Sequence, residues 1–344
     1  MKKSILLLAA MCCAALASAQ MGFGKIKDIE EMEGRKLIVM LEAPAKDAVN
    51  PFKKKDIREE ARADYEAYVE EYNAALREVA GKHWKTGNKG IVFKTRKQVE
   101  ELQKRKDRKY AVLYCTHRRP SGFRSGVALY NRLIWAGSGA NQERTHASLF
   151  TEMRITLIEK FGKDSPVYLA YLANIMPEKS DLAYGMSVMN NYFQMRKANP
   201  KLKFKDVAEA LAANKPRLKE KTLLLREDWI DEAFDTSQIS SLYPYAYSIV
   251  SADAFNEAVA NADARYAYAM IVQKVSNSKG PGSIASSQSV FYRHYLVDAA
   301  DGTVLDIIES PGGKGGKGFL GISISFSKDA PGKYFDAGIA EYAD

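Results

Sequence analysis

Short apolar runs alternate with amphipathic stretches along this chain of 344 residues. Residues 36–43 (KLIVMLEA) form an apolar run that is long enough for a strand and too short for a buried helix. Residues 56–80 place Tyr65, Tyr68 and Tyr72 on one helical face, which predicts a long amphipathic helix whose tyrosines point toward a core.

A strand, a capped helix and a second strand follow. After an apolar stretch at residues 91–93, Thr95 and Gln98 form a capping box that opens a helix. Residues 109–116 (KYAVLYCT) predict a strand with apolar side chains on both of its faces. Both faces of this strand are therefore expected to be covered by other elements. Cys115 is then most simply a buried small hydrophobe.

The middle of the chain has a different pattern. Apolar residues at every fourth position predict a helix over residues 141–161, and further helices are expected from Ser180–Asp181 and from Phe204. The second half resumes the earlier pattern, with strands at residues 221–226, 245–250, 265–272, 290–297 and 304–308 and a helix capped by Ser251. The serine- and glycine-rich stretch at 276–287 reads as a loop.

Two segments 156 residues apart share this order of elements. Four identities accompany it: Glu101 with Glu257, Asp107 with Asp263, Tyr110 with Tyr266, and Ala111 with Ala267. The identities are few, so the interpretation as a repeat depends mainly on element order. We predict an α/β fold, with α+β as the neighbouring class, built from two related modules with mixed sheets. The expected boundaries are a signal peptide at 1–19, an N-terminal module at 20–140, a helical connector at 141–218 and a C-terminal module with a β-hairpin at 219–344.

The N-terminus has the three parts of a secretory signal peptide. Lys2 and Lys3 precede an apolar block at 5–16, and Ala17-Ser18-Ala19 predicts cleavage between Ala19 and Gln20. The block is shorter than a bilayer span. Lipid attachment at Cys12 or Cys13 is an alternative, but the residues before them fit that processing poorly. The sequence thus predicts export to the periplasm, the outer-membrane surface or the medium, with no transmembrane segment in the mature chain.

Charge and cysteine content narrow the class of partner. The net charge of +9 falls to +7 once Lys2 and Lys3 are removed, and the basic residues are spread among glutamates rather than gathered with aromatics, which argues against nucleic acid. An anionic polymer, a lipid headgroup or an envelope protein with an acidic surface fits better, and the alternative is a positive charge that only keeps the protein in solution. Cys115 alone remains in the mature chain, so no internal disulfide is expected and the oligomeric state stays open.

Candidate chemistry is sparse. The chain has four histidines and none of the usual zinc, redox or G-x-S-x-G motifs, so no catalytic residue, metal or cofactor is assigned. Cys115 and His117 would share a strand face, but an interior strand offers neither exposure nor a lowered thiol pKa. The loop after them carries Arg118, Arg119 and Arg124 between serine-glycine turns and is the candidate anion site, with an ordinary solvated loop as the alternative. The lysine-glycine stretch at 312–318 lacks phosphate-loop spacing.

The C-terminal half carries a resemblance. A capped helix, then Asp263-Ala264-Arg265-Tyr266-Ala267-Tyr268, then the stretch from Tyr295 through Asp301-Gly302 to Val304, resembles the small α/β module of the Tol-Pal periplasmic protein and of curli-secretion-type lipoproteins. That resemblance implies protein contacts in the envelope and no catalytic residues. The whole chain also resembles function-unassigned secreted proteins of Gram-negative bacteria that are cleaved before Gln.

Three functional hypotheses follow. The first is an exported, non-enzymatic envelope protein that binds another protein or a polymer. The alternative is a secreted or periplasmic hydrolase of glycan or peptide, whose carboxylates would meet only in the folded chain. The third is a sensor of small anions through the arginine loop.

Overall fold

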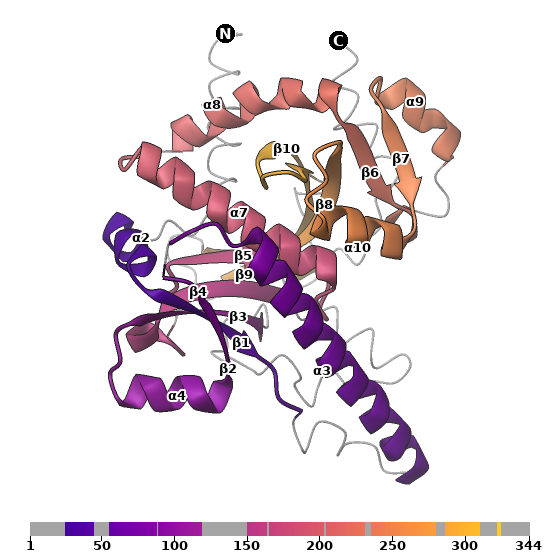
Figure 1. The fold of residues 1–344 in the computed structure, drawn as a ribbon. Helices are drawn as coiled ribbons and strands as arrows, with labels where there is room; N and C mark the ends of the chain where they lie inside the picture. The colour runs from indigo at the N-terminus through magenta and orange to yellow at the C-terminus, as the bar shows by residue number, and fades with distance from the viewer. Residues whose placement is uncertain are drawn as a thin grey trace. The chain divides into compact units, whose positions relative to one another are not determined.

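The computed structural model describes residues 25–44, 55–87, 89–118, 150–163, 165–202, 204–230, 235–279, 286–309 and 322–324. The chain divides into two compact units, Met1–Val207 and Ala208–Asp344. Each unit has its own mixed sheet, as the predicted α/β class with two modules requires (Figure 1). None of the helices in these described ranges has the length and apolar character needed to span a membrane.

The first unit is a five-stranded sheet with helices on both faces. Its elements in chain order are α2 (Ile26–Glu33), β1 (Lys36–Leu41), α3 (Lys55–His83), β2 (Ile91–Thr95), α4 (Arg96–Lys104), β3 (Tyr110–Arg118), β4 (Phe150–Leu157), the 3₁₀ turn η1 (Ile158–Lys160), β5 (Tyr168–Tyr171) and α7 (Lys179–Ala198). The strand order is β2-β1-β3-β4-β5, in which β1, β2 and β3 are parallel while β4 and β5 add antiparallel. Helix α8 (Phe204–Asn214) crosses the boundary between the units.

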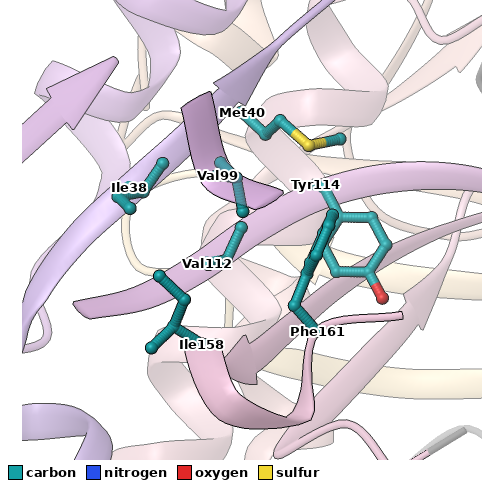
Figure 2. Close-up of a cluster of buried hydrophobic side chains, with 7 residues drawn as sticks. All are labelled: Ile38, Met40, Val99, Val112, Tyr114, Ile158 and Phe161. Atoms are coloured by element: carbon teal, nitrogen blue, oxygen red, sulfur yellow. The ribbon is translucent and has the colours of Figure 1, made fainter. Parts of the chain in front are cut away.

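An apolar cluster lies between this sheet and α4 (Figure 2). Its members alternate along β1 and β3 and are joined by residues of α4, of η1 and just after η1: Ile38, Met40, Val99, Val112, Tyr114, Ile158 and Phe161. The rings of Tyr114 and Phe161 pack edge to face with centroids 5.1 Å apart. Alternation along the strands therefore places one residue set in this core and leaves the other set for the opposite face.

Helices α3 and α7 cover that opposite face. The tyrosine stripe of α3 points inward as predicted, with Tyr65 and Tyr72 buried. Gly185 of α7 sits so close to β4 that a Cβ atom there would lie 2.9 Å from the sulfur of Met153. A larger residue would have to displace the side chain of Met153, so glycine allows the close packing.

The second unit repeats the strand order and directions of the first. Its elements are η2 (Lys215–Glu220), β6 (Thr222–Arg226), η3 (Glu227–Trp229), η4 (Thr236–Gln238), α9 (Ile239–Leu242), β7 (Tyr247–Val250), α10 (Ala252–Ala260), β8 (Tyr266–Lys279), β9 (Ser286–Asp298), β10 (Val304–Glu309) and β11 (Ile322–Ile324). The order is β7-β6-β8-β9-β10, with β11 paired to β9. Here β6, β7 and β8 are parallel and β9 and β10 antiparallel, so the five strands correspond one to one with β1–β5.

Residues 156 apart also make the same backbone contacts. Lys106 and Ala262, each two residues after the end of its helix (α4 and α10), both have positive φ, 56° and 52°. The residue that follows each of them donates its backbone N–H to a carbonyl oxygen of the preceding helix. Asp107 donates to Leu102 in the first unit, and Asp263 donates to Ala258 in the second. The left-handed conformation costs a side-chain-bearing residue about 1–2 kcal/mol. The same costly turn thus stands at the same place in both units.

Most predicted elements are confirmed, and the exceptions lie in the middle of the chain. The predicted helix at 141–161 is wrong where the structure describes it, because β4 occupies Phe150–Leu157. Apolar residues four apart share a helical face but also a strand face, since four is an even number, so this spacing fits both periods. The connector at 141–218 is correspondingly not helical throughout: β4 and β5 belong to the first sheet.

Two smaller corrections concern loop and cap positions. The predicted loop at 276–287 is shorter, because β8 continues to Lys279 and β9 begins at Ser286. Helix α7 is capped by Glu178, and Asp181 is the third helical residue, whose side chain completes the capping box. The sequence also predicts a strand at 127–135, which lies outside the described residues.

Candidate functional site

The first region of interest is where β1 and β3 end in the first unit. Ligands of open α/β sheets bind outside the carboxyl ends of parallel strands. The strand β3 brings Cys115 and His117 to this edge, on the face covered by α3 and α7. We call these two residues, with Thr151 and Asp181, the carboxyl-edge cluster.

His117 is completely buried and bonded to the neighbouring strand. Its Nδ1 atom lies 2.9 Å from Oγ1 of Thr151, the residue opposite it on β4. The same hydroxyl donates its proton to the carbonyl oxygen of Ile175, at 2.6 Å. A hydroxyl has one proton to donate, so Nδ1 of His117 must be the donor in the other bond. Thr151 therefore sets the tautomer of His117.

Cys115 is also interior, as predicted, with 2% of its surface exposed. Burial raises the pKa of its thiol to about 12, and the nearby carboxylates of Glu42 and Asp181 act in the same direction. A hydrogen bond with Tyr72 lowers the pKa but does not offset burial. The reactive form of cysteine is the thiolate. At neutral pH the described geometry thus holds a neutral thiol next to a bonded imidazole.

This burial predicts slow alkylation of Cys115. In the mature chain we expect iodoacetamide at mildly alkaline pH to label the native protein at least about a hundredfold more slowly than the urea-unfolded protein, because thiolate fraction and access are both low. The control is Lys97→Cys in a Cys115→Ala background, which places a thiol at an exposed position of α4. Native labelling at the rate of that control would contradict the enclosed thiol.

Asp181 completes the cluster as a backbone acceptor. One carboxylate oxygen accepts from the amides of Ala173, at 2.9 Å, and Asn174, at 3.3 Å. The other accepts from the side chain of Asn174, at 2.9 Å, and from the amide of Glu178, at 3.0 Å. Burial raises the pKa of Asp181 to about 6 even though these donors favour its charged form. The carboxylate ties the turn after β5 to the start of α7.

The predicted anion site begins at this edge. Arg118 is the last residue of β3 and pairs with Phe150, whereas its side chain, Arg119 and Arg124 lie outside what the structure describes. The arginine loop therefore stays a prediction. The cleavage residues Ala19 and Gln20 and the stretch at 312–318 also fall outside the described ranges.

A second region lies at the opposite end of the same sheet. A cavity of about 150 Å³ opens among the first residues of β1, β2 and β3 and the turn after α3. Its wall includes Met32, Arg35, Leu37, Trp84, Lys89 and Ile91. The sequence alone indicated no role for these residues. The local pattern that could have indicated a cavity is an aromatic residue followed by two glycines after a helix: Trp84, Gly87 and Gly90.

Arg35 forms one wall of this cavity and is held by two carboxylates. Its guanidinium donates to both oxygens of Glu159, at 2.6 and 2.9 Å, and to Glu31 at 2.5 Å. It also reaches the carbonyl oxygen of Tyr110, at 3.2 Å. The bidentate contact lowers the pKa of Glu159. Arg35 therefore joins α2, β3 and η1 into one frame around the cavity.

Neither region assembles a metal site from described side chains: within those ranges, no group of three or more His, Cys, Asp or Glu is placed to hold an ion. The chain is a two-unit α/β protein in which both units share one strand order. No protein-family model, curated protein or solved structure matches it.

Proposed function

We propose that this chain is an exported, non-enzymatic binding protein of the cell envelope, acting in the periplasm, at the outer-membrane surface or in the medium. The observation that carries the proposal is the enclosure of Cys115 and His117. The thiol has its pKa raised to about 12 and the imidazole is fully buried against Thr151. These groups are enclosed within the scaffold, and loops at the edges of a scaffold can carry binding residues.

Export and partner type rest on the sequence. The basic start, short apolar block and Ala17-Ser18-Ala19 support secretion with Gln20 as the new N-terminus. The net charge of +7 after cleavage favours an anionic polymer or an acidic protein surface. The resemblance of the C-terminal half to envelope modules of the Tol-Pal and curli-lipoprotein type supports protein contacts.

Duplication of one α/β module is part of this proposal. Its support is the shared strand order, the matched pairs Leu37–Ile91 and Leu223–Tyr247, and the shared turn at Lys106 and Ala262. Loops diverge faster than the elements that they connect. Two copies of a scaffold with different loops would present two different binding edges.

The test separates location from binding. N-terminal sequencing of the protein recovered from the envelope or medium is expected to begin at Gln20, and recovery of a cytoplasmic chain that begins at Met1 would refute export. The mature chain is expected to bind dextran sulfate, and not neutral dextran, with affinity that falls as salt rises. Replacing Arg118, Arg119 and Arg124 together by alanine is expected to weaken that binding.

Two outcomes would overturn the binding role. One is the absence of any salt-dependent retention on dextran sulfate together with the absence of a reproducible crosslinked protein in the envelope. The other is turnover of glycan or peptide substrates by the purified mature chain, which would favour the hydrolase instead.

A further inference from the structure

The cavity beside β2 is a built feature of the first unit. The turn that forms one side of it is anchored by Asn190 of α7, whose side-chain oxygen accepts from the amide of Lys85, at 3.1 Å, and the hydroxyl of Thr86, at 2.7 Å. The side-chain nitrogen of Asn190, Nδ2, donates to the backbone carbonyl oxygen of His83, at 2.6 Å, at the end of α3. The wall of the cavity is therefore fixed by hydrogen bonds to a buried side chain.

Glycine at position 87 keeps this turn open. Gly87 has φ of +75°, and a Cβ atom there would lie 3.0 Å from the carbonyl oxygen of Glu33. Any side chain would meet both a strained backbone and a close neighbour. The position in the second unit that corresponds to Gly87, 156 residues later, is occupied by Tyr243, which is buried. The two units thus differ in bulk where this cavity lies.

The lining combines apolar and cationic side chains. Met32, Leu37 and Ile91 supply apolar surface and Trp84 an aromatic side chain, while the two charged lining residues, Arg35 and Lys89, are both cationic. The charge of Arg35 is shared with Glu31 and Glu159. Lys89 is exposed and has no carboxylate partner within the part of the chain that the structure describes. Lys89 is therefore the group available to an anion.

We propose that this cavity binds a small carboxylate that carries one aromatic ring or a branched apolar body of similar size. The volume of about 150 Å³ is that of a cavity that holds benzene. The ring would lie among the apolar residues and Trp84, and the carboxylate would pair with Lys89 at the mouth. This binding goes beyond the envelope-partner role and does not depend on it.

Benzoate is the probe for this site. In the mature chain with Trp135→Phe and Trp229→Phe, the remaining Trp84 reports from the cavity wall, and benzoate is expected to change its fluorescence saturably. Benzamide, which has the same shape and no charge, is expected to bind about tenfold more weakly, because it loses the charge-assisted contact. Lys89→Gln is expected to reduce benzoate affinity to the benzamide level.

Lys85→Gln is the matched control, since Lys85 is exposed, lies four residues before Lys89 and does not line the cavity. It is expected to leave benzoate affinity unchanged. The proposal is overturned if benzoate gives no saturable change, if benzamide binds equally well, or if the Lys85 variant loses as much affinity as the Lys89 variant. Such a result would leave the dextran sulfate test untouched, because the two binding events are measured separately.

Discussion

Replacing Asp298 by alanine is expected to lower the free energy of unfolding of the second unit by about 3–5 kcal/mol, the usual cost of removing one partner from a buried ion pair. Asp298 ends β9 and is completely buried. Its carboxylate accepts from Arg217, from Lys221 at 3.0 Å and from the amide of Ala300 at 2.9 Å. Alanine would leave the Lys221 ammonium, which is mostly buried, without this acceptor.

Urea unfolding of the mature chain would measure this loss. Replacing Trp84 and Trp135 by phenylalanine leaves Trp229, which is buried beside Phe255 in the second unit, as the reporter. Asp301→Ala is the control, because Asp301 is half exposed and also pairs with Arg217, so its loss is expected to cost about 1 kcal/mol. Equal losses for the two variants would show that burial of Asp298 does not matter.

Replacing Asp181 by alanine is expected to destabilise the first unit by about 2–4 kcal/mol at neutral pH. The change removes the acceptor of the amides of Ala173, Asn174 and Glu178. Each buried donor left without an acceptor costs about 1–3 kcal/mol. Urea unfolding followed by Trp84, which packs against Phe193 of α7, reports this unit when Trp135 and Trp229 are replaced by phenylalanine.

The pH dependence of this effect follows from the raised pKa of Asp181. The folded-state pKa of about 6 exceeds the ordinary value of 3.8, so the folded state takes up a proton first as the pH falls. The part of the stability that comes from this raised pKa is therefore fully present below about pH 4 and is lost as the pH rises through about 6. The advantage of the wild type over Asp181→Ala should grow by up to roughly 3 kcal/mol between neutral and acid pH.

A control separates this titration from general acid effects. Asp28→Ala removes a partly exposed carboxylate that pairs with Lys160, at 2.7 Å, and is expected to cost about 1 kcal/mol. If the wild-type advantage over Asp181→Ala were the same at both pH values, burial would not raise the pKa of Asp181.

Local patterns predicted much of the fold because they act over a few residues. The apolar run of β1 and the capping box at Thr95 are each encoded by neighbouring side chains. Burial of Cys115 was predictable for the same reason, since alternate and intervening positions of β3 are all apolar. Few identities linked the two units, yet equivalent backbone bonds form, because strand pairing depends on pattern more than on identity.

The candidate sites depended on contacts between distant parts of the chain. Thr151 sets the tautomer of His117 from another strand, and Asn190 anchors the cavity turn from another helix. Arg35 meets Glu159 across 124 residues. Nothing local to any of these residues signals its partner, so charge and hydropathy along the chain did not identify the cavity.

The amino-acid sequence alone thus specified the class of fold, most strands and helices, and the interior character of Cys115, because periodicity and capping operate within one element. Only the tertiary structure assigned Phe150–Leu157 to a strand, since apolar residues four apart suit either element until β3 provides a pairing partner. Likewise the cavity exists only where Met32, Trp84 and Ile91 converge in the first unit. Side chains from separate elements meet there through long-range strand pairing and helix packing, which no short stretch of sequence encodes.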